Sequence, residues 1–394
     1  MTYTAAKRKL QLEMIGMFPF VLLGKIAGHL FTLKTKHPVF LFFPNGDIGG
    51  SPQVNIDLAN CIKDKNPLII FSKKPGNNQF REKYNIEGIR VLDIYKYIDN
   101  KFFHFVNFFF RGLLSVWINK QKNAVVFGGE SIFFYKIIPH LKQHVHCVEL
   151  CHLATWLPYS IGFIDRINHR VFSTQKLKEQ VESQYHQNKL SSAYFSKLFF
   201  IDNAIDIPEY KPTANAALQV YFIGRGAAQK RVHLIAAIAA IIYNKGLPVK
   251  FNFVGDVDKT INPAAFPFCR FYGNVKEEAA MKQIYTEADI LLLTSSFEGL
   301  PIVVMQMMAY GKVVISTAVN GIPDYIYHNE NGLLIKATAE NEIIAEGAAY
   351  IEMLLNNPQL RVKLGKSSRE KAIEKFSRKA FCAGYHKLLK LETD

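Results

Sequence analysis

The sequence predicts an α/β protein of two doubly wound domains, preceded by a basic, amphipathic N-terminal extension. Short apolar runs alternate with helical patterns along most of the chain, two prolines interrupt this alternation near the middle, and residues 1–36 differ in composition from the rest. Strands that alternate with helices favour parallel sheets covered on both faces. A chain of 394 residues also exceeds the roughly 250 residues that one hydrophobic core usually organises, which supports two domains.

Residues 1–36 form a basic segment around an apolar stretch. They carry six Lys and Arg residues against one acid, Glu13. The apolar stretch is interrupted by Pro19 and closed by Lys25, so it falls short of the roughly 20 apolar residues that a spanning helix needs. We expect a helix that lies on anionic lipid. A helix packed on the first domain and a signal peptide are the alternatives.

The first alternating series occupies residues 37–207. A glycine-bearing turn, Pro44–Gly50, follows its first apolar run, and Ser51 is predicted to cap a helix that continues to about Lys63. The aromatic-rich segment 102–118 is predicted to be a core helix, with any exposed part able to contact lipid. Buried strands are expected at 38–43, 67–71, 89–92, 124–127, 147–151 and 170–173.

The second alternating series occupies residues 208–394, after a proline-containing break at 203–212. Open parallel sheets bind ligands beyond the carboxyl ends of their strands, so the loops that follow these strands are the candidate site. Strands are expected at 219–224, 250–254, 268–272, 290–293 and 313–316.

Two loops of this second series carry candidate chemistry. Arg225 and Lys230 lie in a turn that opens a helix, where two cations and helical N–H groups suit a diphosphate. Glu298 follows another strand, just before a helix that Pro301 is expected to start and Gly311 to end. A carboxylate at that edge can accept hydrogen bonds from sugar hydroxyls.

At these positions the second domain resembles the donor domain of the family 4 retaining glycosyltransferases, which have the GT-B fold of two Rossmann-like domains facing a cleft. The resemblance covers residues 219–335. Five landmarks match in register, namely Gly224–Arg225 with Lys230, Ser295 with Glu298–Pro301, Ala288–Ile290, Gly321–Pro323 and Asn331–Leu334.

The resemblance implies roles for the matching residues. Arg225 and Lys230 would bind the donor diphosphate, and Glu298 would hold hydroxyls of the donor sugar close to the reaction. Members of this family need no metal and no other cofactor, because the two cations stabilise the departing nucleotide. The donor-binding residues that we predict are Gly49, Gly50, Gly224, Arg225, Lys230, Glu298, Gly299, Leu300, Pro301 and Gln306.

One position departs from the family pattern. The family's second acid, which follows the first after seven residues and holds the ribose hydroxyls, is Gln306 here. Glutamine keeps an acceptor and adds donors, so ribose binding can persist with altered strength. The base of the nucleotide is therefore left open.

The first domain resembles the family more loosely. Gly49 and Gly50 fit its glycine-rich first turn, and His152 fits its strand-end histidine, which would lie against the donor sugar near the reacting carbon. We predict His152 and Glu298 as the catalytic residues, with a satisfied structural histidine as the alternative for His152. The last helix, about 379–390, would cross back onto the first domain.

Charge and cysteine content suggest where the protein works. A net charge of +15 attracts polyanions, but no nucleic-acid-binding motif is present, so phosphorylated substrates and anionic membranes remain the expected partners. The five cysteines lack metal-site spacing, and we interpret them as reduced thiols of a cytoplasmic protein. We expect it on the inner face of the membrane, using a lipid-linked or glycan acceptor such as a lipopolysaccharide or capsule precursor.

Three other functions fit parts of this pattern. Gln306 allows a catalytically silent relative that binds nucleotide sugars, although the other landmark residues are retained. A GT-B sugar epimerase shares the fold. A dinucleotide-dependent oxidoreductase shares the alternation, but the GxGxxG fingerprint is missing.

Overall fold

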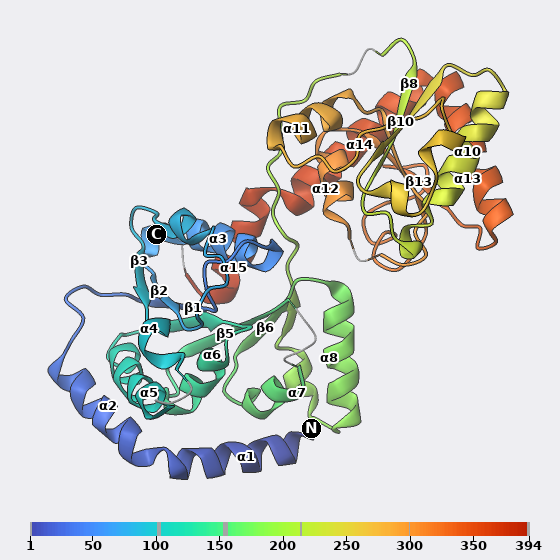
Figure 1. Cartoon of the computed structure of the whole chain (residues 1–394). Coiled ribbons are helices and arrows are strands. Elements are labelled where there is room, and N and C mark those ends of the chain that lie inside the picture. The colour runs from blue at the N-terminus through green and yellow to red at the C-terminus, as the bar shows by residue number, and fades with distance from the viewer. Residues whose placement is uncertain (1, 101–103, 153–156, 213–214, 299, 392–394) are drawn as a thin grey trace. The chain divides into compact units, whose positions relative to one another are not determined.

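The computed structural model describes residues 2–100, 104–152, 157–212, 215–298 and 300–391, and the chain divides into two units. Unit 1 comprises Met1–Ala204 together with Phe381–Asp394, and unit 2 comprises Ile205–Ala380. Each unit contains one parallel sheet with helices on both faces, so the predicted α/β class is confirmed (Figure 1). The sequence placed the boundary at residue 207.

The sheet of unit 1 is doubly wound, with the strand order β3-β2-β1-β4-β5-β6-β7. The chain reverses its direction of winding between β1 and β4, which pair in parallel. The strands are β1 (Val39–Phe43), β2 (Leu68–Phe71), β3 (Arg90–Asp93), β4 (Val125–Gly128), β5 (His146–Cys151), β6 (His169–Phe172) and β7 (Leu198–Phe200).

The helices of unit 1 cover both faces of this sheet. They are α1 (Tyr3–Gly16), α2 (Phe18–Leu30), α3 (Gly50–Cys61), α4 (Tyr95–Ile98), α5 (His104–Asn119), α6 (Ile132–Ile137), α7 (Leu157–Ser160), α8 (Gln175–Gln187), α9 (Ser192–Phe195) and most of α15 (Arg378–Leu389).

Strand β1 shows why the sheet is buried on both sides. All five of its residues are buried, and successive side chains point to opposite faces. Phe40 and Phe42 join a core with residues of α5 and α6. Phe43 joins a second core with residues of α3 and α15. A continuous apolar run is therefore what a central parallel strand requires.

Unit 2 contains a second doubly wound sheet, with the order β10-β9-β8-β11-β12-β13. Its strands are β8 (Leu218–Ile223), β9 (Val249–Val254), β10 (Arg270–Phe271), β11 (Ile290–Leu293), β12 (Val313–Thr317) and β13 (Leu333–Ile335). Its helices are α10 (Val232–Asn244), α11 (Glu278–Glu287), α12 (Ile302–Ala309), α13 (Glu340–Asn356) and α14 (Pro358–Phe376).

The basic N-terminal segment forms two helices, α1 and α2, that join at Met17 and are bent by 67°. Within the described ranges no single helix has the length and hydropathy to cross a membrane, whereas this bent pair passes that test when its two helices are taken together. Helix α2 packs along α5.

Helix α15 brings the C-terminal end of the chain onto unit 1. His386 Nε2 lies 2.7 Å from the carbonyl oxygen of Cys61, the last residue of α3. Phe381 and Tyr385 join the core beside that helix. Cys61 and Cys382 form a disulfide bond across this contact. Our interpretation of all five cysteines as reduced is therefore wrong for these two. The sequence did not reveal the pair because the two residues are 321 positions apart and only the fold brings them together.

Candidate active site

The carboxyl edge of the second sheet carries the two cations predicted to bind a diphosphate. Gly224 and Arg225 form the turn after β8, and Lys230 ends a short 3-10 helix before α10. The Arg225 side chain is exposed, so its guanidinium is accessible to a ligand. The Lys230 side chain is 14% exposed and reaches toward the loop after β11.

Glycines hold the turn after β8 against the turn after β9. The N–H of Gly226 donates to Asp256 Oδ1 at 3.0 Å. A Cβ on Gly226 would lie 2.2 Å from the Asp256 carbonyl oxygen, and one on Gly255 would lie 1.9 Å from the Gly224 carbonyl oxygen. Neither position has room for a side chain, so the two backbones fix the edge on which Arg225 lies.

Glu298 is buried in the loop between β11 and α12. Its carboxylate Oε1 accepts a hydrogen bond from Ser295 Oγ at 2.5 Å and contacts the Lys230 ammonium group. A buried carboxylate needs such partners, because desolvation of an unpaired charge is expensive. Two of the predicted donor-binding residues are thus brought together.

Arg231 holds the same two loops together and was missed by the sequence reasoning. Its guanidinium donates to the carbonyl oxygens of Thr294, at 2.6 Å, and Ser295, at 3.0 Å. Its backbone has a φ of 45°, a left-handed conformation that is unusual for arginine. No local pattern in the sequence distinguishes this arginine from its neighbour Lys230.

Helix α12 begins beside Glu298. Pro301 is its N-cap residue rather than its first helical residue, and no side chain caps the helix, so first-turn N–H groups are available to an anion or a sugar hydroxyl. Leu300, Pro301 and Gln306 are half-buried. Gly299, which we also predicted in this site, lies outside the described residues. Gly311 follows the helix with a φ of 70°, as a terminating glycine should.

The carboxyl edge of the first sheet carries the glycine-rich turn. Gly49, and not Ser51 as we predicted, is the N-cap of α3. Its φ of 163° is ordinary extended backbone, and a Cβ on Gly50 would meet nothing within 4 Å. Space therefore lies over the start of this helix. The hydroxyl of Ser51 instead donates to Glu130 Oε2 at 2.7 Å.

His152 directly follows β5 at the same edge of the first sheet. Its Nε2 atom is buried and has no hydrogen-bond partner in the part of the chain that the structure describes. Burial lowers the pKa of the imidazole from 6.5 to about 4. The ring is therefore neutral at physiological pH and can donate or accept one hydrogen bond at the unsatisfied nitrogen.

Glu130 is a second polar residue at this edge that the sequence did not reveal, and its side chain is half-buried. It follows β4 with a left-handed φ of 55°. Burial raises the pKa of its carboxyl group, while the Ser51 hydroxyl and the backbone N–H of His152 lower it. Its Oε1 atom is buried without a partner among the described residues. Glu130 therefore lies between the glycine-rich turn and the strand-end histidine.

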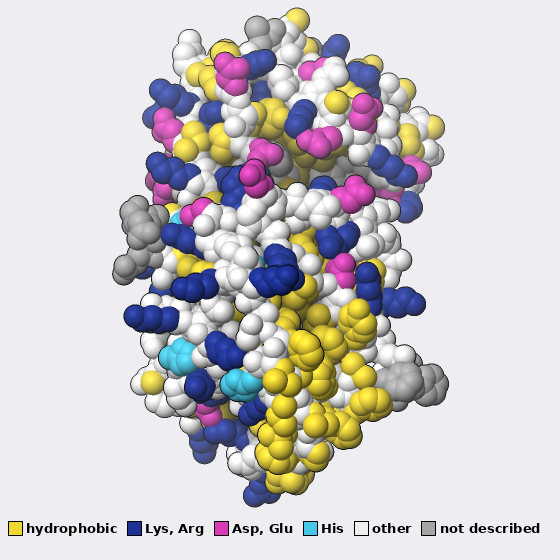
Figure 2. Space-filling model, turned by 90° about the vertical axis from the view of Figure 1, so that its left-hand side faces the viewer, with side chains coloured by type: hydrophobic (Ala, Val, Ile, Leu, Met, Phe, Trp, Pro, Cys, Tyr) yellow, Lys and Arg dark blue, Asp and Glu magenta, His cyan; other side chains and the backbone are white. Residues whose placement is uncertain are grey.

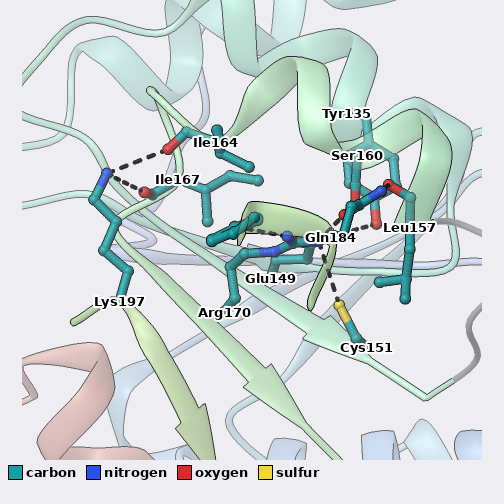
Figure 3. A network of polar contacts seen from close by, with 11 residues as sticks. Tyr135, Glu149, Cys151, Leu157, Ser160, Ile164, Ile167, Arg170, Gln184 and Lys197 are labelled. Carbon is teal, nitrogen blue, oxygen red and sulfur yellow. Dashed lines mark hydrogen bonds and ion pairs between the residues drawn. The ribbon is translucent and has the colours of Figure 1, made fainter. Parts of the chain in front are cut away.

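A buried ion pair stabilises the strand that precedes His152 (Figure 3). Arg170 Nε on β6 donates to Glu149 Oε2 on β5 at 2.5 Å, and both side chains are almost fully inaccessible to solvent. Tyr135 donates to the second carboxylate oxygen, and Ser160 and Tyr185 accept hydrogen bonds from the guanidinium. All of these groups are satisfied within the protein, which is typical of a structural network.

Comparison with known proteins assigns the family. The model of the glycosyl transferases group 1 family matches residues 207–371. An uncharacterized glycosyltransferase of Haemophilus influenzae is 33% identical over 345 residues, which is 84% of this chain and 93% of that protein. The chain belongs to the glycosyl transferases group 1 family. The resemblance predicted from the sequence is thereby confirmed.

Further relatives and solved structures extend this result. The capsular polysaccharide biosynthesis glycosyltransferase CapM of Staphylococcus aureus is 24% identical over 55% of this chain, and the chain spans 57% of the length of that relative. The crystal structure of Anabaena HepE in complex with UDP and glucose has a TM-score of 0.63 and 15% identity, covering 90% of this chain and all of that one. This likeness shows the GT-B fold.

The described residues among those predicted for this group 1 glycosyltransferase lie at the carboxyl edge of one sheet in each unit. Lys230 and Glu298 are in contact in unit 2, next to the turn with Gly224 and Arg225. At the edge in unit 1 are Gly49, Gly50 and His152 with the additional residues Ser51 and Glu130. Within the described residues, no group of three or more His, Cys, Asp or Glu side chains is arranged to hold a metal ion.

Proposed function

We propose that this protein is a retaining glycosyltransferase that moves a hexose or related sugar from a nucleotide diphosphate sugar to a cell-surface glycan acceptor. The observation that carries the proposal is the buried Glu298 carboxylate, in contact with Lys230 and Ser295 at the carboxyl edge of β8 and β11. The buried pair of Lys230 and Glu298 lies next to the turn that carries the exposed Arg225. The two cations suit a diphosphate, and the carboxylate suits the hydroxyl groups of a sugar.

The proposed chemistry assigns charge stabilisation to the cations. As the bond between the sugar and the phosphate breaks, negative charge grows on the departing phosphate, and Arg225 and Lys230 stabilise that charge. They take the place of a metal ion, and no cofactor is needed in this proposal. Glu298 accepts hydrogen bonds from donor-sugar hydroxyls and so orients the reacting carbon. Nucleotide binding is supported by the HepE structure, whose ligands include UDP.

Retention of configuration follows if the acceptor attacks the face from which the nucleotide departs. The acceptor oxygen then forms the new glycosidic bond while its proton passes to the departing phosphate oxygen. In the proposed site the neutral imidazole of His152 hydrogen-bonds the donor sugar near the reacting carbon, because its buried Nε2 atom has no partner among the described residues. Positioning and electrostatics are then the protein's contribution.

The acceptor in this proposal is a lipid-linked glycan precursor at the inner face of the cytoplasmic membrane. The capsular relative and the basic N-terminal segment support it. A disulfide is uncommon in the reducing cytosol, so the Cys61–Cys382 pair tests the placement. If the protein works in the cytosol, cellular reductants should open this bond, and thiol alkylation in intact cells should label both cysteines. Protection of both cysteines from alkylation in cells would place the protein in an oxidising compartment.

The experiment that tests the function is thermal stabilisation by UDP, GDP, ADP and their sugars, followed by turnover with the nucleotide sugar that binds. A ligand at one hundred times its Kd stabilises the native state by about 2.7 kcal/mol. One nucleotide class should raise Tm, and Glu298→Ala and Arg225→Ala should remove the rise. Lys282→Ala changes an exposed lysine on α11 of the same unit and should keep the rise. Equal shifts in all variants would reject the site.

A catalytically silent relative is the second candidate, which Gln306 favours because it replaces the family's ribose-binding acid. Both candidates bind nucleotide in unit 2, so binding does not separate them. Transfer or slow hydrolysis of any nucleotide sugar would exclude the silent relative. Binding without turnover across the whole panel would select it.

A further inference from the structure

The helices α1 and α2 expose an unusual amount of apolar surface. Ten large hydrophobic side chains on or beside them are between 39% and 74% exposed. Figure 2 shows hydrophobic side chains gathered in one patch on the face that carries α2. We call this patch the outer face, and its residues are Leu12, Ile15, Phe18, Phe20, Leu22, Leu23, Ile26, Leu30, Phe31 and Phe105.

Glycines on the inner side of α2 direct its large side chains outward. The face of α2 that meets α5 consists of Val21, Gly24 and Gly28. A Cβ on Gly24 would lie 1.9 Å from the Phe109 carbonyl oxygen, and one on Gly112 would lie 2.1 Å from the Val21 carbonyl oxygen. The two backbones therefore touch, which leaves little room for large side chains on this face, and most large side chains of α2 are exposed on the other side.

Helix α1 is attached to unit 1 through polar groups. Lys7 pairs with Asp165 at 2.5 Å, and the Tyr3 hydroxyl donates to the same carboxylate at 2.7 Å. Glu13 contacts the ammonium group of Lys136. An ordinary surface helix buries its apolar side, and α1 does so at Ala6 and Leu10, whereas Leu12 and Ile15 toward its C-terminal end are 71% and 74% exposed. Water alone is a poor environment for such a surface.

The charge around the outer face is positive. Arg8, Lys9, Lys34 and Lys36 are exposed in the same segment. The one acid of residues 1–36, Glu13, is already paired with Lys136. A second copy of this chain would bring two sets of these cations together across a two-fold axis, which is unfavourable. An anionic surface is the complementary partner.

We propose that the outer face inserts into the headgroup and acyl boundary of an anionic lipid bilayer without crossing it. The 67° bend and the lateral attachment of both helices to unit 1 suit a pair that lies in the interface plane. Phe20 packs against Phe105, with ring centroids 5.8 Å apart, so α2 and α5 present one continuous surface. Membrane docking would bring the enzyme close to a lipid-linked acceptor, and this advantage rests on the proposed function. The membrane binding itself does not depend on that function.

The test is sedimentation of the full-length protein with vesicles of phosphatidylcholine alone or mixed with phosphatidylglycerol. Binding should require the anionic lipid. Leu23→Glu with Ile26→Glu should lower the partition coefficient by at least about tenfold, because two apolar groups no longer enter the bilayer. Lys34→Glu with Lys36→Glu should lower it by about fivefold or more per residue. The matched control, Val362→Glu with Ile373→Glu, changes two exposed apolar residues of unit 2 and should bind as the unchanged protein does.

Each other outcome would overturn the proposal in a specific way. If the control variant lost as much vesicle binding as Leu23→Glu with Ile26→Glu, the outer face would not be the binding surface. If the unchanged protein sedimented with neither kind of vesicle, lipid would not be its partner. A dimer in solution that Leu23→Glu with Ile26→Glu dissociates would assign a second copy instead. Resistance to carbonate extraction would indicate a spanning pair. Nucleotide-induced stabilisation, measured on the same variants, reports separately on the proposed function.

Discussion

Lys230 and Glu298 contact each other although they lie on different loops, so the cation and the carboxylate of the predicted site neutralise one another. A donor diphosphate would compete with Glu298 for the lysine, while sugar hydroxyls would compensate the carboxylate. Substitution of Lys230 alone should therefore show how much each role of this lysine contributes, the pairing with Glu298 and the binding of a diphosphate.

Lys230→Ala should weaken both folding and nucleotide binding. It removes the cation from the buried Glu298 carboxylate, which keeps the hydrogen bond from Ser295, and the free energy of unfolding should fall by about 1–3 kcal/mol. Nucleotide affinity should fall by about tenfold or more with the loss of a charge-assisted contact. Urea unfolding and calorimetric titration measure the two effects. Arg225→Ala is the matched control, since this exposed cation should affect affinity while changing stability by less than about 0.5 kcal/mol.

Gln306→Glu should increase nucleotide affinity in the proposed site. Gln306 is half-buried on α12, and a carboxylate there would accept two ribose hydroxyls as an ionised group. Hydrogen bonds to charged groups are stronger than neutral ones by roughly 1 kcal/mol, so we expect a gain of about fivefold. Calorimetry with the stabilising nucleotide checks this, with the 2′-deoxynucleotide as control. A gain of the same size with the 2′-deoxynucleotide, which has lost one of the two hydroxyls, would place Gln306 away from the ribose.

The stability of unit 1 should decrease between pH 6.5 and about pH 4. The pKa values of His152 and His140 are each lowered from 6.5 to about 4 by burial, so the unfolded state takes up protons before the folded state does. The stabilising contribution is full above pH 6.5 and is lost as the pH falls toward 4. At most it amounts to about 3 kcal/mol per histidine.

His152→Asn isolates the histidine predicted in the site. The difference in unfolding free energy between the unchanged protein and this variant should become smaller as the pH falls through that window. Urea unfolding at several pH values measures it. A pH-independent difference would mean that the pKa of His152 is the same in the folded and unfolded states.

The sequence predicted regular elements better than it predicted tertiary contacts. Continuous apolar runs such as β1 and β11 were located because buried parallel strands need them. The three-residue strands β7 and β13 are too short to show a pattern and were missed. The candidate site loops of unit 2 were predicted from family landmarks, as at Glu298, and these assignments stay predictions. Glu130 and Arg231 were missed because left-handed loop residues carry no periodic signal.

Glu130 should act through its neighbours in the first domain. Glu130→Leu removes the hydrogen bond from Ser51 and leaves the His152 segment without that carboxylate, so kcat should fall by about tenfold or more with little change in the donor KM. Glu130→Gln keeps an oxygen that can accept from Ser51 and should recover most of the activity. Equal loss in both variants, with reduced Tm, would indicate a purely structural role.

The backbone contact between α2 and α5 should be intolerant of any side chain. A Cβ on Gly24 would overlap the Phe109 carbonyl group, so Gly24→Ala must separate the helices or shift them. Such overpacking costs about 1–3 kcal/mol and should lower Tm. Gly16→Ala is the matched control, because a Cβ there meets nothing within 4 Å and alanine favours the helix by up to about 1 kcal/mol. If Gly24→Ala were as stable as Gly16→Ala, α2 would not be held by α5, and the outer face would have no fixed orientation.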